Sequence, residues 1–312
     1  MKALVLGGTG FIGSHVVDRL LAEGHSVRVF AAVSERYRSP LPHVDYRIAS
    51  FDDLHALAEA LEGIEVVFHL ISTTVPATSN TDPVSDVRSN LIGSINLLNL
   101  MVEKAIPRIV FSSSGGTVYG VPESIPVTET HPLRPICSYG VVKVAIENYI
   151  TMFSQLYGLE FVILRAANPF GERQGYVGIQ GIIGTAFEKA LKGESITVWG
   201  NGGSVRDYIY VDDLARLFTI AGSSEYSGVF NAGCGIGRSV HEVLSAVEEV
   251  SGILISKEYL PPRAFDIPNN ELSIKKARDI YGWIPEIDFI DGLRRTWNWY
   301  LKQVDSTTKC KD

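Results

Sequence analysis

Cysteine is scarce in this sequence. Cys137, Cys234 and Cys310 are odd in number and are not spaced like zinc ligands. A disulfide framework and a bound metal are therefore not expected, and this cysteine usage favours a reducing, cytoplasmic compartment. Long apolar runs are also missing, since none approaches the roughly 20 residues that a membrane helix needs. Lys2 lies directly before the first apolar run, so we expect no signal peptide.

Positive charge is in short supply as well. The 312 residues carry a net charge of −7, and no block of basic residues occurs. A nucleic-acid partner is therefore not expected. The seven histidines form no cluster of metal-ligand type along the chain. With 46% hydrophobic residues, the chain is long enough for one large domain or two coupled domains with a sizeable core.

Glycine, by contrast, is concentrated near the N-terminus. Gly7, Gly10 and Gly13 stand between an apolar run at 3–6 and a helical pattern at 11–23. A strand, a glycine turn and a helix in this order are typical of dinucleotide-binding sites. Gly7 permits the tight turn, Gly10 lets the backbone approach a pyrophosphate, and Gly13 lets the helix lie close to its strand. The free N–H groups of Phe11 and Ile12 at the start of the helix would then face the phosphates.

The rest of the first half alternates between short apolar strands and amphipathic helices. We expect strands at 27–30, 44–49, 66–70, 108–111 and 161–164. We expect one helix that begins after Asp52 as its cap, and two more helices at 83–104 and 138–157. This alternation predicts an α/β fold with a Rossmann-type doubly wound parallel sheet. After Arg165 the elements shorten and Gly, Pro and Asn become frequent. We therefore expect a dinucleotide-binding domain at 1–167 and a smaller C-terminal α/β lobe at 168–312. The boundary is expected to be interleaved, because part of 205–240 can rejoin the main sheet.

Tyr139 and Lys143 form the second chemical signal. Residues four apart lie on one face of a helix, so the lysine can favour the phenolate of the tyrosine. Such a phenol is a usable general acid–base. Tyr-x-x-x-Lys alone more often marks a surface pair, but here it follows the hydroxyl-rich strand end of a dinucleotide fold.

Four motifs in order carry a resemblance over nearly the full length. They are Gly-Gly-Thr-Gly-Phe-Ile-Gly at 7–13, Ser-Ser-Ser-Gly-Gly-Thr-Val-Tyr-Gly at 112–120, Ser-Tyr-Gly-x-x-Lys at 138–143, and Val-Arg-Asp-Tyr-Ile-Tyr-Val-Asp-Asp at 205–213. The chain thereby resembles the extended short-chain dehydrogenase/reductase family, especially its nucleotide-sugar 4-epimerases of the UDP-glucose 4-epimerase type. The resemblance implies NAD as cofactor, a UDP-sugar substrate and a catalytic Ser–Tyr–Lys set.

The catalytic hydroxyl has two candidates. Ser114 lies 25 residues before Tyr139, the spacing expected for the epimerases, and Thr117 is the second candidate. Ser112 and Ser113 are expected to form hydrogen bonds to the backbone at the strand end. Related dehydratases and decarboxylases carry an acid just before Val-Tyr-Gly. Gly115, Gly116 and Thr117 stand there instead, which favours an epimerase or a 4-keto-sugar reductase.

The resemblance implies two sets of binding residues. The cofactor set is Gly7, Gly10, Phe11, Ile12, Gly13, Ala31, Ser50, Phe51, Leu70, Asn90, Ser112, Tyr139 and Lys143. The substrate set is Thr73, Ser114, Asn168, Arg206, Arg263, Asp266 and Asn270. For the two arginines, the alternatives are a salt bridge of Arg206 to Asp207 or Asp212 and a solvated surface charge at Arg263. A small residue at Asn270 predicts room for an N-acetyl group on the sugar.

The end of the second strand departs from the usual NAD pattern. Ala31 stands where an acid normally binds the adenosine ribose, and Ser50 replaces an expected Asp. We expect NAD, but NADP is not excluded, because Arg36 and Arg38 lie nearby and suit a 2′-phosphate. A non-catalytic NAD(P)-binding regulator is a further alternative. The resemblance also implies a homodimer, formed through a four-helix bundle of the helices near 83–104 and 138–157.

Overall fold

Seven parallel strands form the central sheet, in the order β10-β6-β5-β4-β1-β2-β3. The computed structural model describes residues 1–174, 181–263 and 267–309. The strands of the sheet are β1 (Lys2–Leu6), β2 (Ser26–Ala31), β3 (Asp45–Ile48), β4 (Val66–His69), β5 (Arg108–Ser114), β6 (Glu160–Ala166) and β10 (Gly228–Ala232). The predicted Rossmann-type α/β fold is confirmed.

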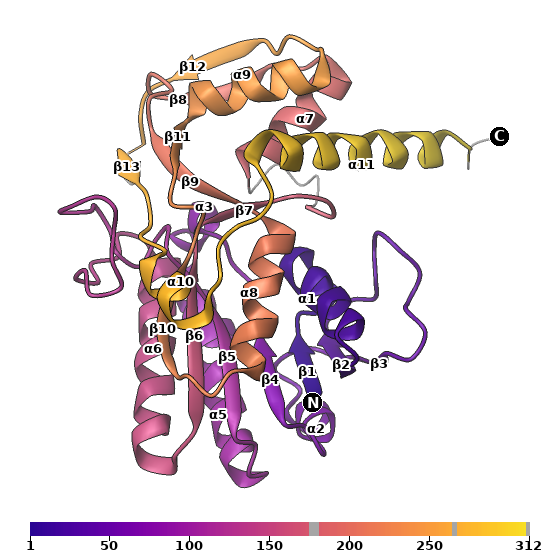
Figure 1. The fold of residues 1–312 in the computed structure, drawn as a ribbon, viewed down its shortest axis with the longest axis vertical. Coiled ribbons are helices and arrows are strands. Elements are labelled where there is room, and N and C mark those ends of the chain that lie inside the picture. The colour runs from indigo at the N-terminus through magenta and orange to yellow at the C-terminus, as the bar shows by residue number, and fades with distance from the viewer. Residues whose placement is uncertain (175–180, 264–266, 310–312) are drawn as a thin grey trace.

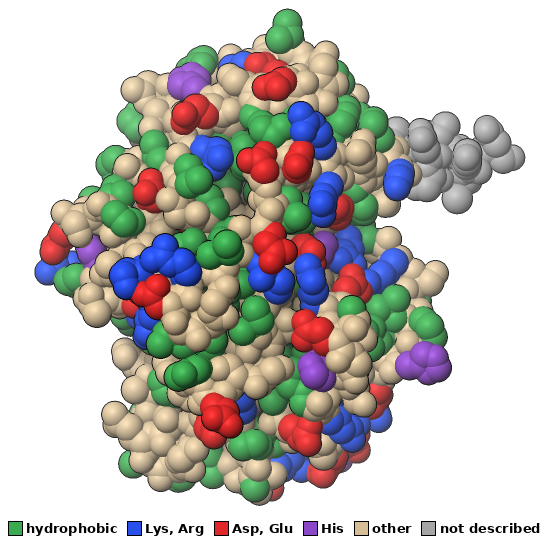
Figure 2. Space-filling view, in the orientation of Figure 1, with side chains coloured by type: hydrophobic (Ala, Val, Ile, Leu, Met, Phe, Trp, Pro, Cys, Tyr) green, Lys and Arg blue, Asp and Glu red, His purple; other side chains and the backbone are tan. Residues whose placement is uncertain are grey.

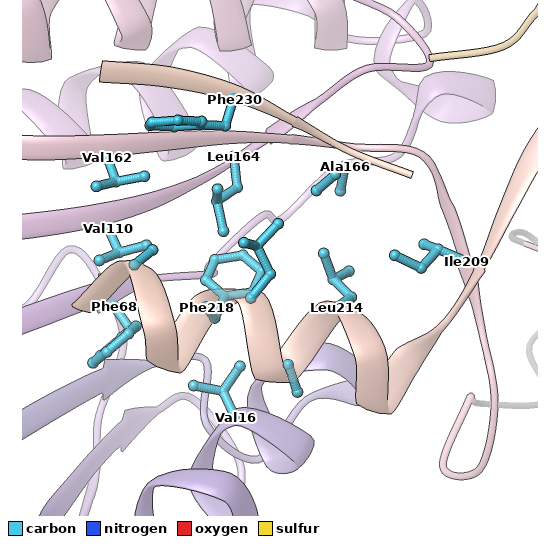
Figure 3. Packing of buried hydrophobic residues seen from close by; sticks show 14 of the residues in the cluster. Val16, Phe68, Val110, Val162, Leu164, Ala166, Ile209, Leu214, Phe218 and Phe230 are labelled. Carbon is cyan, nitrogen blue, oxygen red and sulfur yellow. The ribbon is translucent and has the colours of Figure 1, made fainter. Parts of the chain in front are cut away.

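Helices cover both faces of this sheet (Figure 1). Side chains on successive residues of a strand point to opposite faces, so a fully buried parallel strand is apolar throughout. One face packs against α1 (Phe11–Ala22), α8 (Val211–Ser223) and α10 (Lys275–Tyr281). The other packs against α2 (Leu54–Ala60), α5 (Gly93–Glu103) and α6 (Ser138–Tyr157). Figure 3 shows the first of these layers, where Leu214 and Phe218 of α8 lie against Val110 and Leu164.

Two predicted helices differ in detail from the structure. The cap of α2 is Asp53, whose carboxylate accepts from the Ala56 N–H at 3.0 Å, and the prediction of Asp52 is wrong. The helix expected at 83–104 is interrupted. Its parts are α4 (Pro83–Asp86), the π-helix η1 (Val87–Ile92) and α5. Within it, the Ser94 hydroxyl donates to the Asn90 carbonyl four residues earlier at 2.7 Å, and such bonds bend helices.

A smaller lobe stands over the carboxyl ends of the strands (Figure 1). Its strands are β7 (Asn168–Phe170), β8 (Ile196–Trp199), β9 (Val205–Tyr210), β11 (Gly237–Ser239), β12 (Lys257–Leu260) and β13 (Asn269–Asn270). Its helices are α7 (Ile182–Lys192), α9 (Val240–Ser251) and α11 (Phe289–Lys309), and they share an aromatic-rich core that includes Phe187, Trp297 and Tyr300. The last helical piece, α3 (Pro76–Ser79), follows β4.

The chain crosses between the two parts more than once. After β9 it returns to the sheet as α8 and β10, and β10 pairs with β6 in parallel. Among the described residues, no helix is long and apolar enough to cross a bilayer. On the face seen in Figure 2, acidic and basic side chains are interspersed rather than gathered in a field of one sign.

Candidate functional site

A cleft of about 570 Å³ lies between the sheet and the smaller lobe. In open parallel sheets, ligands bind at the carboxyl edge where the strand order reverses, which here is between β1 and β4. Gly7 follows β1 and Leu70 follows β4, and both line the cleft. Residues of all four motifs meet there, together with three predicted site residues from outside the motifs. The motif residues are Gly7, Gly10, Phe11, Ile12, Gly13, Ser112, Ser114, Thr117, Tyr139, Lys143 and Arg206, and the others are Leu70, Asn168 and Arg263.

The glycine loop forms a cradle that side chains would fill. Gly7 has a φ of +82°, and its carbonyl accepts from the Gly10 N–H at 2.9 Å. A Cβ on Gly13 would lie 2.1 Å from the Gly7 carbonyl oxygen. Helix α1 can therefore lie this close to the end of β1 only because residue 13 is a glycine. The first N–H groups of α1 have no acceptor within the helix. These observations fit a bound pyrophosphate.

Tyr139 and Lys143 lie on the first turns of α6, facing the end of β5. The Lys143 ammonium is buried and donates to the Ser112 carbonyl at 2.8 Å. It lies 4.7 Å from the Phe111 ring centroid and 5.5 Å from that of Tyr139. The helix therefore presents a phenol to the cleft with a positive charge one turn behind it.

Burial dominates the proton affinities of this pair. It raises the pKa of Tyr139 to about 12, and hydrogen bonding with the Ser72 hydroxyl opposes this in part. It lowers the pKa of Lys143 to about 8, while Glu147 and Asp86 act in the opposite direction. The phenol is thus a neutral hydrogen-bond donor at pH 7. Positive charge added to the cleft would lower its pKa.

Both candidate hydroxyls line the cleft. Ser114 ends β5, and Thr117 lies one turn further on, where its N–H donates to the Ser114 carbonyl at 3.3 Å. The Thr117 Oγ1 atom is buried and has no hydrogen-bond partner among the described residues. Gly115 allows this turn, because a Cβ there would lie 2.5 Å from Leu272. The Ser113 hydroxyl donates to the Glu147 carboxylate within the core, a side-chain partner rather than the backbone partner that was expected.

Two arginines reach the cleft from the smaller lobe. Arg206 on β9 donates to the carbonyls of Val205 and Ile267, and the Arg263 guanidinium lies 5.2 Å from the Trp199 ring centroid. The acids proposed as alternative partners of Arg206 bind other groups. Asp207 accepts from the N–H groups of Cys234 and Gly235, and Asp212 pairs with Arg19.

The family model for the NAD-dependent epimerase/dehydratase family matches residues 3–233. The chain belongs to this family. The resemblance seen in the sequence is thereby confirmed, as is NAD as the cofactor.

Several relatives of this chain carry the name UDP-glucose 4-epimerase. A putative UDP-glucose 4-epimerase of Methanocaldococcus jannaschii is 37% identical over 299 residues, covering 95% of this chain and 97% of that protein. A Thermotoga maritima UDP-glucose 4-epimerase solved with UDP-glucose has a TM-score of 0.93 and 34% identity, covering 97% of this chain and 100% of that one. A Thermus thermophilus UDP-glucose 4-epimerase complex with NAD has a TM-score of 0.91 and 35% identity, covering 96% and 99%.

Six of the described residues that were predicted to bind cofactor or substrate do not line the cleft. They are Ala31, Ser50, Phe51, Thr73, Asn90 and Asn270. Ala31 and Phe51 are buried in the core, and Ser50 is exposed. The Asn90 amide accepts from the Thr73 N–H at 2.9 Å, so it shapes the loop after β4. Asn270 donates to the Gly115 carbonyl at 2.9 Å, beneath the turn that carries Thr117. Asp266 lies outside the described residues.

The region near Ala31 also shows where the two nearby arginines lie. Arg38 forms ion pairs with Asp18 and Glu35, and Arg36 is exposed. The positive charge of Arg38 is therefore largely balanced by these carboxylates.

Sequence reasoning missed several residues of the site. Ser72 and Thr74 line the cleft, and so does Gln174, which lies beyond the end of β7. Asp86 is buried nearby and accepts hydrogen bonds from Thr74 and Ser138. The run of three polar residues at 72–74, which closely follows the buried strand β4, was a usable signal. Asp86 gave none, because an acid near the start of a helix is common at the surface.

Proposed function

We propose that this protein is a nucleotide-sugar 4-epimerase that inverts C4 of a UDP-hexose. The observation that carries the proposal is the meeting of Tyr139 and Lys143, the hydroxyls after β5 and the glycine cradle in one cleft, with two arginines opposite. The Thermotoga relative was solved with UDP-glucose, and the Thermus relative with NAD. Among activities of the family, a dehydratase or decarboxylase is disfavoured because no carboxyl group stands at Gly115, Gly116 or Thr117.

The protein side of the chemistry is acid–base. The Tyr139 phenol would take the proton from the sugar 4-hydroxyl and return it after the hydride has been transferred to the other face of C4. Lys143 would stabilise the phenolate and bind the nicotinamide ribose. Ser114 would donate a hydrogen bond to the 4-oxygen, with Thr117 as the alternative donor. Bound NAD would supply the hydride acceptor and an added positive charge in the cleft.

The substrate diphosphate would bind on the lobe side. Guanidinium forks match diphosphate oxygens in geometry and charge, so Arg206 and Arg263 are its proposed partners, together with the Asn168 amide. Asn168 lies half-buried at the cleft wall, where its amide donates to the Asp207 carbonyl at 3.0 Å. In this proposal 1–167 forms most of the cofactor domain and 168–312 the substrate lobe, with α8 and β10 returning to the sheet.

The direct test is interconversion of UDP-glucose and UDP-galactose by the purified full chain. We expect turnover without net oxidation or reduction of cofactor, and added NAD is the control. Stoichiometric consumption of NADPH with a 4-keto sugar nucleotide would instead support a reductase. No turnover of UDP-glucose, of UDP-galactose or of their N-acetyl analogues would overturn the proposal. UDP-N-acetylglucosamine belongs in the same assay, because the sequence predicts room for an N-acetyl group, although Asn270 does not itself line the cleft.

Cofactor choice has its own titration. We expect NAD to bind more tightly than NADP, because Arg38 is already paired with two acids and nothing else described near Ala31 suits a 2′-phosphate except the exposed Arg36. Equal affinities would show that this end of β2 does not discriminate, and Arg36→Ala would then reveal whether Arg36 holds the phosphate.

We also propose a cytoplasmic homodimer with a two-fold axis. The exposed faces of the α4–η1–α5 segment and of α6 carry large apolar side chains, which are Val84, Ile92, Val141, Met152, Leu156 and Tyr157. Exposed apolar residues on adjacent helices suit a four-helix bundle between two copies. Light scattering should give twice the chain mass, and Met152→Glu with Leu156→Glu should give a monomer. A monomeric wild-type protein would refute this assembly.

A further inference from the structure

Asp86 is a fully buried carboxylate at the junction of three elements. Its exposed fraction is 0%, and it ends the short helix α4. Its Oδ1 atom accepts from the Thr74 hydroxyl at 2.7 Å and from the Asn90 amide at 2.9 Å. Its Oδ2 atom accepts from the Ser138 hydroxyl at 2.7 Å. Buried carboxylates need such partners, and here they come from the loop after β4, from η1 and from the start of α6.

These three contacts join the cleft wall to the catalytic helix. Thr74 lines the cleft, and Ser138 directly precedes Tyr139. The side chain of Cys137, the residue before the first turn of α6, provides no cap, so the nearby carboxylate also complements the positive end of the helix. A second tie comes from Asn80, whose amide oxygen accepts from the Ser138 N–H at 2.9 Å. The position of the Tyr139 phenol thus depends on a helix start that is held mainly through Ser138.

We propose that Asp86 is a positioning residue for the reaction, which fixes the first turn of α6 against the loop at 72–74 and places a negative charge behind Tyr139 and Lys143. This inference rests on the proposed function for its kinetic consequences, but not for its geometric ones. Asp86 does not line the cleft among the described residues, so it acts through Ser138 and Thr74 rather than on substrate.

The charge of Asp86 acts in the same direction on the pKa values of Tyr139 and Lys143. It disfavours the phenolate of Tyr139 and favours the ammonium of Lys143, which raises both pKa values. The other titratable groups near the pair are Cys137 before α6, Glu147 with its partner Arg165, and His69 at the end of β4. Glu147 is already paired with Arg165, whereas among the described residues the Asp86 carboxylate has only uncharged hydrogen-bond donors. Removing the charge of Asp86 should therefore shift both titrations to lower pH.

Two substitutions separate position from charge. Asp86→Asn removes the charge but keeps the size and one acceptor oxygen. We expect kcat to fall by about tenfold or more with little change in KM, since a small misplacement of a catalytic group has effects of this order. Both limbs of its pH–rate profile should move to lower pH. Ser138→Ala keeps the charge and loses the tether, so it should lower kcat without moving the profile.

The matched control lies on the same helix. Asp82 is exposed and caps α4 by accepting from the Ser85 N–H at 2.9 Å. Asp82→Asn removes an equal charge, and Asn is an equally good cap. We expect its kcat and pH profile to match those of the wild type. Thermal unfolding of each variant shows whether the fold is intact.

A second readout does not need a substrate. Carbon-13 NMR of labelled tyrosine follows the ionisation of Tyr139 directly, and Tyr139→Phe assigns the signal. Ionisation should begin at lower pH in Asp86→Asn than in the wild type. An unchanged Tyr139 titration, or an equal shift in Asp82→Asn, would overturn the inference. If the wild type fails to epimerise any UDP-sugar, the proposed function fails, while the NMR titration still decides the role of Asp86.

Discussion

Replacing Gly13 by alanine tests how the glycine cradle holds the cofactor. The new Cβ would lie 2.1 Å from the Gly7 carbonyl oxygen, 2.8 Å from its carbon and 2.9 Å from the Gly8 Cα. All three atoms belong to the backbone, so no side-chain rotation relieves the contact. An ordinary carbon–oxygen contact is about 1 Å longer, and helix α1 must therefore move away from β1 by roughly that distance.

Two effects follow from this displacement. Overpacking of this kind costs about 1–3 kcal/mol of unfolding free energy, against which the better helix propensity of alanine returns up to ~1 kcal/mol. The N–H groups at the start of α1 move with the helix, so their hydrogen bonds to a pyrophosphate lose alignment. A displacement of this size lowers affinity by about 10- to 100-fold, by analogy with misplaced catalytic groups.

The assay is calorimetric titration of NAD into cofactor-free protein, beside thermal unfolding. Gly24→Ala is the control at the other end of α1. Its φ is +79° with nothing within 4 Å of the added Cβ, so alanine there costs about 1 kcal/mol through backbone strain alone. Gly24→Ala should lose stability and keep its NAD affinity. If Gly13→Ala binds NAD within twofold of the wild type, the cradle does not position the cofactor.

Three further predictions concern other parts of the structure. Ser114→Ala should lower kcat by about 10²-fold and Thr117→Ala by less, as measured by steady-state epimerisation, and the reverse order would make Thr117 the catalytic hydroxyl. Burial lowers the pKa of His69 to about 3, so unfolding free energy should fall as pH drops below 6.5, by up to ~1.4 kcal/mol per pH unit for this group. His69→Gln should flatten that slope in urea titrations, whereas the exposed His55→Gln should not, and equal slopes would refute the assignment. Glu147→Ala leaves Arg165 as a buried, unpaired cation and should lower the unfolding free energy by about 3–5 kcal/mol. Glu188→Ala, in the more exposed pair with Lys192, should lower it by less than about 1 kcal/mol. Similar losses in the two variants would contradict the buried-pair argument.

The sheet and its helices follow from local signals in the sequence. The buried residues 3–6 of β1 and 66–68 of β4 are all apolar, and the helix expected near 138–157 is confirmed with these bounds. It ends at Gly158, which adopts a left-handed conformation. The interruption of the helix after Pro83 was not predicted. It depends on side-chain bonds of Asn90 and Ser94 to the backbone and to a distant loop, which no periodicity reveals.

The site was predictable where chemistry and chain order coincide. The glycine loop, Tyr139 and Lys143 all meet in the cleft because each follows a strand of one parallel sheet. Two residues that were assigned by resemblance alone, Asn90 and Asn270, do not line the cleft. Asn270 and Asn90 bond to the backbone of neighbouring turns, so their link to the cleft is indirect. Ser72 and Asp86 act through contacts between distant segments, and a linear sequence does not show these contacts.

The most direct test of the account is the turnover of Tyr139→Phe, which removes the phenolic oxygen and keeps the ring. Its binding of NAD and of UDP-glucose should stay close to that of the wild type, while kcat for conversion to UDP-galactose should fall by about 10²- to 10⁴-fold. A Tyr139→Phe protein that still interconverts the two sugars within tenfold of the wild-type rate would contradict the role of the phenol.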